Sequence, residues 1–291
     1  MDRIIKNIVF HAPRLLSDRK FVEYLYEYRT GRKPNLDNPV TFSEKMQYLK
    51  LHNQNPLFTR LADKAEAKNY ATQVIGEEHI IPTIGVYDSV SQIDWNALPE
   101  QFVLKCTHDC ASVAVCRSKA SLDIPKVEKA LRRGLRTNYY YQNREYPYKN
   151  IRPRIICEKY MHDERQQQSL TDYKFFCFAG KPDFMYVSSG LTDHSTASIS
   201  FCDLSGAPLP FCRADYKPFP EGQIPLPEHF DEMKSIAEKL ARAIDTAFVR
   251  IDLYEIAGTI YFSEFTFFPN SGIIPFRPAE WDRTLGDKIQ L

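Results

Sequence analysis

The stretch 248–272, FVRIDLYEIAGTIYFSEFTFFPNSG, constrains the fold of this chain more than any other. Two runs rich in aromatic and β-branched residues, 248–254 and 259–267, alternate between apolar and polar positions, which predicts two antiparallel strands. Residues 256–258 would form a three-residue loop, with Gly258 supplying the positive φ that such a loop needs at its last position. The stretch is therefore predicted to be a β-hairpin.

In this register the two faces of the hairpin differ in polarity. Arg250 lies opposite Glu264, and Asp252 lies opposite Phe262. Two carboxylates with an arginine beside them suit Mg²⁺ binding and the neutralisation of phosphate oxygens. A solvent-exposed strand face with an Arg/Glu pair would show the same pattern, so both interpretations stand at this point. The expected core face is Val249, Ile251, Leu253, Tyr261, Ser263, Phe265 and Phe267, and the expected polar face is Arg250, Asp252, Glu264 and Thr266.

The composition indicates a globular protein and narrows the classes of partner. A chain of 291 residues with 43% hydrophobic residues can bury a real core in one large domain or in several small ones. A formal net charge of +1 argues against general binding to nucleic acid or to an anionic membrane. There is no apolar run of about 18 residues or more and no signal-peptide pattern. We therefore expect a cytoplasmic protein.

The seven cysteines are an odd number and contain no C-x-x-C motif. Most lie in apolar, strand-like runs, so we expect buried free thiols. Cys106, His108 and Cys110 suggest a zinc site only weakly, because no second ligand pair follows at the usual spacing.

Residues 1–52 are expected to be helical. A short basic amphipathic helix at 4–16 would either pack on the body of the protein or touch a membrane surface weakly. Thr41 and Glu44 form a capping box that begins a helix reaching residue 51.

Two further helices are expected at 56–75 and 227–244. The first ends at Gly76 and places Lys64 and Lys68 one turn apart, which on its own predicts a solvated basic surface. The second has one apolar stripe, formed by Met233, Ile236, Ala237 and Leu240.

Two other stretches attract attention for their chemistry. Lys105 closes an apolar strand at 102–106, an arrangement that places an ammonium group at a hairpin mouth, where a phosphate can reach it. The segment 137–148 interleaves aromatic with basic residues. Base stacking is one explanation, but the near-neutral chain argues against nucleic acid. We expect an acceptor-binding or interdomain segment that could stack on a sugar, with a plainly packed loop as the alternative.

Three motifs together resemble one known family. Arg250-Ile-Asp252, then Glu264-Phe-Thr266 and Pro269-Asn-Ser-Gly272, resembles the ending of ATP-grasp ligases such as D-alanine:D-alanine ligase, with threonine at 266 instead of asparagine. The run IICEKYM at 155–161 resembles the adenine-binding hinge of the same enzymes. With DYKFFCF at 172–178, the chain is similar to the TupA-like branch over roughly residues 20–280. That branch is associated with bacterial surface polysaccharides and teichuronopeptide-like polymers.

The resemblance implies a role for each group. Arg250 would steady the transferring phosphoryl group, and Glu158 would face the exocyclic amine of adenine. Because the loop 107–112 lacks glycine, His108 and Ser112 would donate to phosphate through their side chains. The implied catalytic residues are Lys105, Lys174 and Arg250, and the implied ligands of two Mg²⁺ ions are Asp252, Glu264 and Thr266. The implied ATP contacts are Lys64 (or Lys68), Lys105, His108, Ser112, Glu158, Lys159, Tyr160, Met161 and Glu164 (or Asp163).

The expected fold is α+β, an ATP-grasp fold in which two α+β subdomains clasp ATP beside an N-terminal helical region. The predicted parts are the helical region 1–54, a pre-grasp segment 55–90, a central subdomain 91–160 and a C-terminal subdomain 161–291. The chain departs from the branch at 192–198, where hydroxyl residues and His194 stand in place of a basic residue. The sequence does not indicate which residue of this segment would contact the phosphate or the acceptor.

The expected reaction joins a carboxylate to an amine through an acylphosphate, with consumption of ATP. By analogy, the carboxylate belongs to a uronic acid, in a nucleotide-linked or glycan form, and the amine to an amino acid or amino alcohol. A sugar or alcohol kinase on the same scaffold is one alternative. A glycosyltransferase is another, but the D-x-D metal motif that it requires is absent from the sequence. A non-catalytic ATP-binding module would not need the full set of phosphate and metal candidates.

Overall fold

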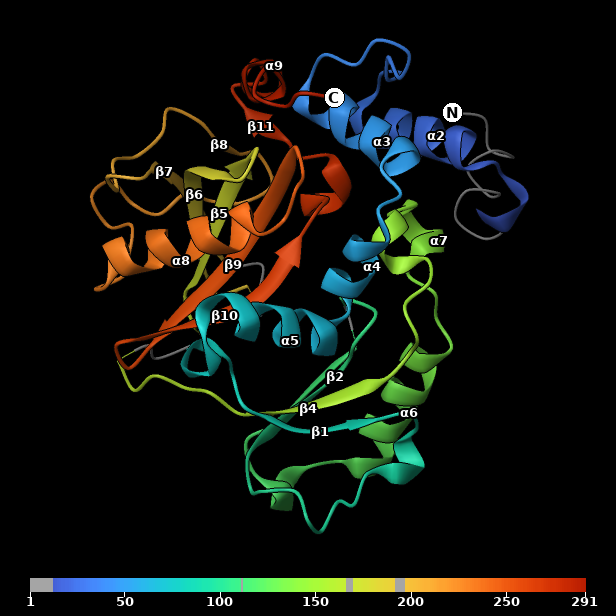
Figure 1. Ribbon diagram of the computed structural model, residues 1–291, viewed down its shortest axis with the longest axis vertical. Coiled ribbons are helices and arrows are strands. Elements are labelled where there is room, and N and C mark those ends of the chain that lie inside the picture. The colour runs from blue at the N-terminus through green and yellow to red at the C-terminus, as the bar shows by residue number, and fades with distance from the viewer. Residues whose placement is uncertain (1–12, 111, 166–169, 192–196) are drawn as a thin grey trace.

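The computed structural model describes residues 13–110, 112–165, 170–191 and 197–291. Its main elements are two separate antiparallel sheets, the small one in the lower half of Figure 1 and the large one in the upper half. The small sheet has the order β1 (Thr83–Tyr87), β4 (Ile155–Lys159), β2 (Phe102–Cys106), β3 (Val113–Cys116). The large sheet has the order β10 (Thr259–Thr266), β9 (Phe248–Ile256), β5 (Asp172–Phe178), β6 (Lys181–Ser189), β7 (Ser198–Asp203).

Each sheet has its own hydrophobic core. On the small sheet, α6 (Ile124–Leu135) places Leu131 against β2. On the large sheet, α8 (Phe230–Arg242) lies across one face, as Figure 1 shows. The predicted apolar stripe of this helix is confirmed, because Met233, Ile236, Ala237 and Leu240 are all buried. The other face of the large sheet, which α8 does not cover, is therefore the one left for other contacts.

The hairpin predicted at 248–267 is present, but its predicted loop length is wrong. Ile256 pairs with Thr259, so the turn has two residues, Ala257 and Gly258. Their φ values of 50° and 81° are both positive, as a type I′ turn requires. The pairing is shifted by one residue from the predicted register.

A β-bulge then shifts the pairing again between Phe262 and Glu264. Phe262 therefore faces the core opposite Leu253 and is buried, whereas Tyr261, predicted to be a core residue, is only half-buried. Beyond the bulge, Glu264 lies opposite Asp252 and not opposite Arg250, which corrects the predicted pairing. The two carboxylates are thus brought directly face to face.

Helix α3 (Phe42–His52) packs on the core of the large sheet, and helix α2 (Asp18–Thr30) packs on α3, although both are far from that sheet in the sequence. Figure 1 shows α3 beside the C-terminal helix α9 (Trp281–Gly286). The ring of Phe42 lies 5.2 Å from that of Phe248 and 6.0 Å from that of Phe276. The predicted capping box of Thr41 and Glu44 is confirmed. Most of the predicted basic helix at 4–16 lies outside the described residues.

The single helix predicted at 56–75 is interrupted at Asp63. The structure has α4 (Pro56–Ala62) and α5 (Lys64–Ile75), with Asp63 in an extended conformation between them. Its carboxylate accepts hydrogen bonds from the backbone of Ala65 and Glu66, which is the usual role of an aspartate before a helix. The remaining elements are the short helix α7 (Tyr140–Asn143) and a two-stranded ribbon of β8 (Cys212–Arg213) and β11 (Phe276–Arg277).

The cysteines are free, and five of the seven are buried, as expected. Cys110 is exposed and Cys212 is half-buried. Cys106, His108 and Cys110 do not form a group of metal-ligand atoms within the described part of the chain. In the same part, no helix combines the length and the apolar character that crossing a lipid bilayer requires.

Candidate active site

One cavity, with a volume of about 630 Å³, lies between the two sheets. The small sheet contributes Lys105, Glu158 and Lys159, and the large sheet contributes Asp172 and Tyr254. A volume of this size is typical of a site for a nucleotide-sized ligand. Its apolar wall consists of Ile81, Val103, Val113, Val115, Met161, Leu170 and Leu191. An apolar slot with cations beside it fits a nucleotide base attached to phosphates.

Glu158 lies between two lysines at the floor of this cavity. It forms ion pairs with Lys68, from α5, and with Lys105 at 2.7 Å. Burial alone would raise the pKa of Glu158, but the two ammonium groups outweigh burial and lower this pKa to about 2. Burial lowers the pKa of Lys68, whereas the Lys105 side chain keeps 30% of its surface exposed. Lys105 is therefore held in position and is still open to a ligand.

The segment that follows β4 forms one edge of the cavity. Lys159, Tyr160, Met161 and Glu164 all line it. Asp163 also lines the cavity, but it is buried and accepts hydrogen bonds from Arg165 and from the backbone N–H of Ala257, in the turn between β9 and β10. Of the two carboxylates considered for ribose, Glu164 is the exposed one on the cavity wall.

A chain of charged groups lies on the polar face of the large sheet. Lys174 bonds Asp172 at 2.6 Å and lies 3.3 Å from Asp252. Arg250 donates two hydrogen bonds to the Asp252 carboxylate, at 2.7 and 2.6 Å, and one to the hydroxyl of Tyr186 at 3.3 Å. Asp252 raises the pKa of both Lys174 and Arg250 against the effect of burial. These cations therefore stay charged while buried.

Glu264 and Thr266 complete this polar face on the neighbouring strand β10. The Glu264 side chain is 40% exposed, and its nearest polar contacts are the Thr266 hydroxyl at 3.3 Å and Arg250 at 3.9 Å. The Glu264 carboxylate has only these long contacts and lies beside the Thr266 hydroxyl. This arrangement fits Mg²⁺, which prefers oxygen ligands. Each oxygen of Asp252 accepts one hydrogen bond from Arg250, so a metal ion at Asp252 would use a remaining lone pair of these oxygens.

Three residues predicted to contact ATP lie apart from the cavity lining. Lys64 donates to the carbonyl of Asp109 at 2.5 Å. His108 is buried, and its ring Nε2 lies 3.1 Å from the carbonyl of Gly134 in α6. Ser112 bonds the Asp109 carboxylate through both its N–H and its hydroxyl. These contacts hold the three side chains on neighbouring protein groups, and their roles toward ATP stay predictions.

A second cavity, of about 230 Å³, borders the polar face of the large sheet. Arg250, Glu264 and Thr266 line it. Its remaining wall comes from the predicted acceptor-binding segment 137–148, from the N-terminal helix α2, from the loop after β10 and from one residue between β2 and β3. These residues are Arg29, Cys110, Tyr139, Asn143, Glu145, Tyr148, Phe268, Asn270 and Ser271. The charged chain from Asp172 to Arg250 thus connects the two cavities.

Several of these residues were not expected from the sequence. Tyr186, which bonds Arg250, sits in an apolar strand whose pattern indicates only a core position. Arg117 lines the first cavity from the end of β3 but belongs to no motif. Arg29 is separated from Arg250 by most of the chain. For the polar face of β5, the sequence signal is the alternation that places Asp172 and Lys174 on one face of the strand.

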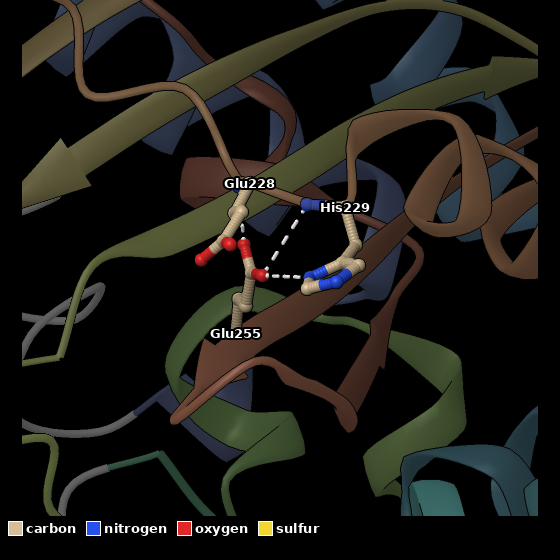
Figure 2. A group of neighbouring side chains, drawn as sticks. All are labelled: Glu228, His229 and Glu255. Carbon is tan, nitrogen blue, oxygen red and sulfur yellow. Dashed lines mark hydrogen bonds and ion pairs between the residues drawn. The ribbon is translucent and has the colours of Figure 1, made fainter.

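One further cluster, shown in Figure 2, lies outside both cavities: Glu228, His229 and Glu255. The Glu255 carboxylate accepts hydrogen bonds from the backbone N–H groups of Glu228 and His229, at 2.7 and 3.3 Å. The His229 ring lies 2.6 Å from the same carboxylate, and this contact raises the pKa of His229. A carboxylate placed there stabilises the beginning of α8, which is a structural role.

Comparisons with known proteins agree with this geometry. The family model described as TupA-like ATPgrasp matches residues 44–290. No curated protein matches the sequence. Among solved structures, D-alanine–D-alanine ligase from Bacillus anthracis, complexed with ATP, is 14% identical, with a TM-score of 0.46 over 84% of this chain and 72% of that chain. The ATP-grasp ligase PsnB, complexed with minimal precursor, Mg and ADP, is 10% identical, with a TM-score of 0.46 over 96% and 72%.

The family match covers most of the chain, including both sheets and every predicted site residue. It confirms the α+β ATP-grasp fold predicted from the sequence, and with it the enzyme class, an ATP-grasp ligase. The two subdomains of that fold correspond to the two sheets between which the larger cavity lies. The chain therefore belongs to the TupA-like ATP-grasp family.

Proposed function

We propose that the protein joins a carboxylate to an amine, with ATP as the energy source and an acylphosphate as the intermediate. The observation that carries this proposal is the chain of charged groups connecting the two cavities. Asp172 lines the cavity that suits a nucleotide, and Arg250 lines the cavity beside it. Lys174 and Asp252 lie between them. A phosphoryl group leaving the first cavity would meet a substrate in the second.

ATP would occupy the larger cavity. The apolar slot would take adenine, with the backbone of Tyr160 and Met161 along its edge. Lys105 and Lys159 would neutralise phosphate oxygens, and Glu164 would meet the ribose hydroxyls. The Glu158 carboxylate lies between Lys68 and Lys105, so its first effect is to hold Lys105 in place. This arrangement supports binding and orientation of the nucleotide.

Phosphoryl transfer depends mainly on positioning and on neutralising negative charge. Arg250 supplies a fixed guanidinium where the transferring group would pass, oriented by Asp252 and Tyr186. Lys174 holds Asp172 and Asp252 at their spacing. Mg²⁺, in one or two ions, would be held by Glu264 and Thr266, together with the remaining lone pairs of Asp252, and would add positive charge at the phosphate oxygens.

The two chemical steps balance without a protein nucleophile. A carboxylate oxygen attacks the γ-phosphorus, the bond from phosphorus to the ADP oxygen breaks, and an acylphosphate forms. An amine nitrogen then attacks the acyl carbon, the carbon–oxygen bond breaks, and phosphate leaves while the amine gives up a proton. The polar face supplies cations and oxygen ligands for the first step. The external amine discharges the intermediate.

Isotope transfer and trapping test this reaction. With ¹⁸O in the carboxylate, one labelled oxygen should appear in the released phosphate, because the acyl carbon–oxygen bond is the one that breaks. Hydroxylamine should intercept the acylphosphate as a hydroxamate. Full turnover should need carboxylate and amine together, with only slow ADP formation from the carboxylate alone. A stable phosphorylated product without label transfer would establish a kinase, and product formation without ATP a glycosyltransferase.

We further propose a uronic acid unit of a bacterial surface glycan or its precursor as the carboxylate, and an amino acid or amino alcohol as the amine. This proposal rests on the TupA-like family membership. The experiment is a screen of ADP release across uronates, free and nucleotide-linked, each with a panel of amines. Turnover confined to non-sugar acids would overturn the glycan assignment and leave the ligase reaction standing.

A further inference from the structure

The second cavity is built by parts of the chain that lie outside both sheets, apart from the hairpin residues it shares with the polar face. Arg29 comes from α2, and Asn143 and Tyr148 come from the segment after α6. Asn270 and Ser271 come from the loop after β10. At about 230 Å³ the cavity is smaller than the usual range for drug-sized ligands, so its occupant is a small molecule.

Arg29 is the distinctive charge of this cavity. Its guanidinium donates to the Asn143 side chain at 3.3 Å and to the backbone carbonyl of Asn270 at 3.4 Å. Among the described residues, no carboxylate lies within ion-pair distance of it, whereas Arg19 on the same helix pairs with Glu23 and Asp37. Arg29 thus lines the cavity with hydrogen bonds to neutral groups only, and its charge interacts with that of Glu145 without forming an ion pair with it.

The negative groups near Arg29 are committed to other contacts. Glu145 accepts a hydrogen bond from the Ser271 hydroxyl at 2.7 Å and is buried. Burial raises the pKa of Glu145, while Lys50, the Ser271 hydroxyl and Arg29 act in the opposite direction. Glu264 lines the same cavity next to Arg250. The lining thus has two arginines and two glutamates, and Arg29 is the cation there that has no ion pair among the described residues and can take a negatively charged group of a ligand.

The remaining polar groups of the wall suit hydroxyl groups. Asn143 donates to the hydroxyl of Tyr139 at 3.4 Å, and the hydroxyl of Tyr148 lies 3.7 Å from the Cys110 sulfur. Burial raises the pKa of Tyr139 and of Tyr148, so both phenols stay protonated. Phenol and amide groups can both donate and accept, which matches a hydroxylated molecule.

We propose that this cavity binds the acid substrate of the ligation, and that the hydroxylated unit of this substrate that enters the cavity carries a second negatively charged group besides the reacting carboxylate. One group, the carboxylate that reacts, lies at Arg250. The other pairs with Arg29 and makes Arg29 the residue that selects the acid. This inference rests on the proposed function, because the reacting carboxylate must lie beside the polar face of the hairpin.

Three four-carbon probes test the charge requirement. Tartrate has two carboxylates, threonate has one and threitol has none, and all three carry hydroxyl groups. The readout is the rate at which iodoacetamide modifies Cys110, which lines the cavity and is exposed, measured by mass spectrometry. Cys212, half-buried on β8 and outside this cavity, is the internal reference. We expect tartrate to protect Cys110 strongly, threonate weakly and threitol not at all, with no change at Cys212.

Substitution of Arg29 identifies the residue responsible. Arg29→Gln should weaken protection by tartrate by about tenfold or more, to the level of threonate, because a hydrogen bond between charged groups is lost. Arg29→Lys should keep part of it, and Arg19→Gln, the same change on the same helix, should keep all of it. Equal protection by tartrate and threitol, or an unchanged effect of tartrate in Arg29→Gln, would overturn the proposal.

The failure of this inference can be told apart from the failure of the proposed function. Stabilisation of the protein by Mg-ATP is measured on the same samples and does not depend on Arg29. Wild-type stabilisation by Mg-ATP without protection by tartrate removes the acid site and leaves the ATP site in place. Protection by tartrate without any effect of Mg-ATP removes the ligase proposal and leaves an anion site that contains Arg29.

Discussion

Arg250 and Asp252, two residues apart on strand β9, hold each other through two hydrogen bonds of 2.7 and 2.6 Å. Because side chains two positions apart on a strand share a face, this pair is set by the strand itself. The pair fixes the guanidinium, and each oxygen of Asp252 accepts one of the two hydrogen bonds. Glu264, opposite Asp252 and 40% exposed, is the more accessible carboxylate for an ion.

Glu264→Gln should reduce ATP turnover by about 100-fold or more and leave the fold intact. The change removes a charge from the polar face and no contact from the core, and the loss of one preorganised charge partner costs about 3 kcal/mol in the transition state. ADP release at saturating Mg²⁺ and a thermal melt without ligand measure the two effects. Glu232→Gln, at an exposed position of α8, is the control. Wild-type turnover in Glu264→Gln would refute the metal assignment.

Mg-ATP should raise the melting temperature, and Lys159→Ala and Lys105→Ala should each reduce the increase. A ligand at 100 times its dissociation constant stabilises the native state by about 2.7 kcal/mol. Lys105→Ala also removes one partner of Glu158, so the comparison must use the shift caused by ligand and not the melting temperature itself. If Mg-ATP did not change the melting temperature of the wild-type protein, the proposed nucleotide site would be wrong.

The stability of the protein should fall steeply in acid because of Glu158. Its pKa is lowered to about 2 from an ordinary value of 4.5, so its contribution is fully present above pH 4.5 and is lost as the pH falls toward 2. The contribution is about 3 kcal/mol at most, since one pKa unit is worth about 1.4 kcal/mol and the burial of Lys68 offsets part of it. Urea unfolding between pH 5 and pH 2 should show a shallower pH dependence in Glu158→Gln. An identical dependence would contradict the ion-pair geometry.

The loop after β10 should tolerate little change at Gly272. Asn270, Ser271 and Gly272 all have positive φ, and Gln47 and Lys50 of α3 donate hydrogen bonds to the carbonyl of Ser271. A methyl group at Gly272 would lie 2.5 Å from the Cβ of Met46.

Gly272→Ala should therefore lower the free energy of unfolding by about 2–4 kcal/mol, from left-handed strain together with overpacking. Gly31→Ala is the matched control: Gly31 also has positive φ, but no atom lies within 4 Å of an added methyl group. It should cost only about 1 kcal/mol. If urea unfolding showed the same loss of free energy in both variants, the Met46 side chain would have moved to accommodate the added methyl group.

The polarity of the hairpin faces could be predicted because alternation depends only on neighbouring residues. The register could not, for two physical reasons. Ala257 adopts a positive φ of 50°, which a residue other than glycine rarely does, so the shorter turn was not expected. The bulge between Phe262 and Glu264 then added one residue to β10, which brought Glu264 and Thr266 back to the predicted face. Two shifts thus preserved the polar face and changed the partners.

The larger cavity, between the two sheets, was easier to predict from the sequence than the second cavity. Lys105 and the segment from Glu158 to Met161 lie at the ends of two neighbouring strands, and each carries its own local motif. The second cavity collects single residues from segments that have no motif in common, such as Arg29 and Asn270. Contacts of this kind depend on how the N-terminal helices dock, for example through Phe42 on Phe248, and no local pattern reports that docking.

The packing of α3 on the large sheet, and of α2 on α3, has a consequence for how such a protein can diverge. The larger cavity is lined mainly by the two sheets and the segment after β4, whereas much of the second cavity's wall is supplied by α2, by 139–148 and by the loop anchored on α3. Under the proposed function, exchanging these outer segments would change the preference for the acid while the strands of both sheets stay unaltered. Relatives that share the two sheets but differ in these segments are therefore expected to act on different acids, and grafting the segments between them is a route to new ligases.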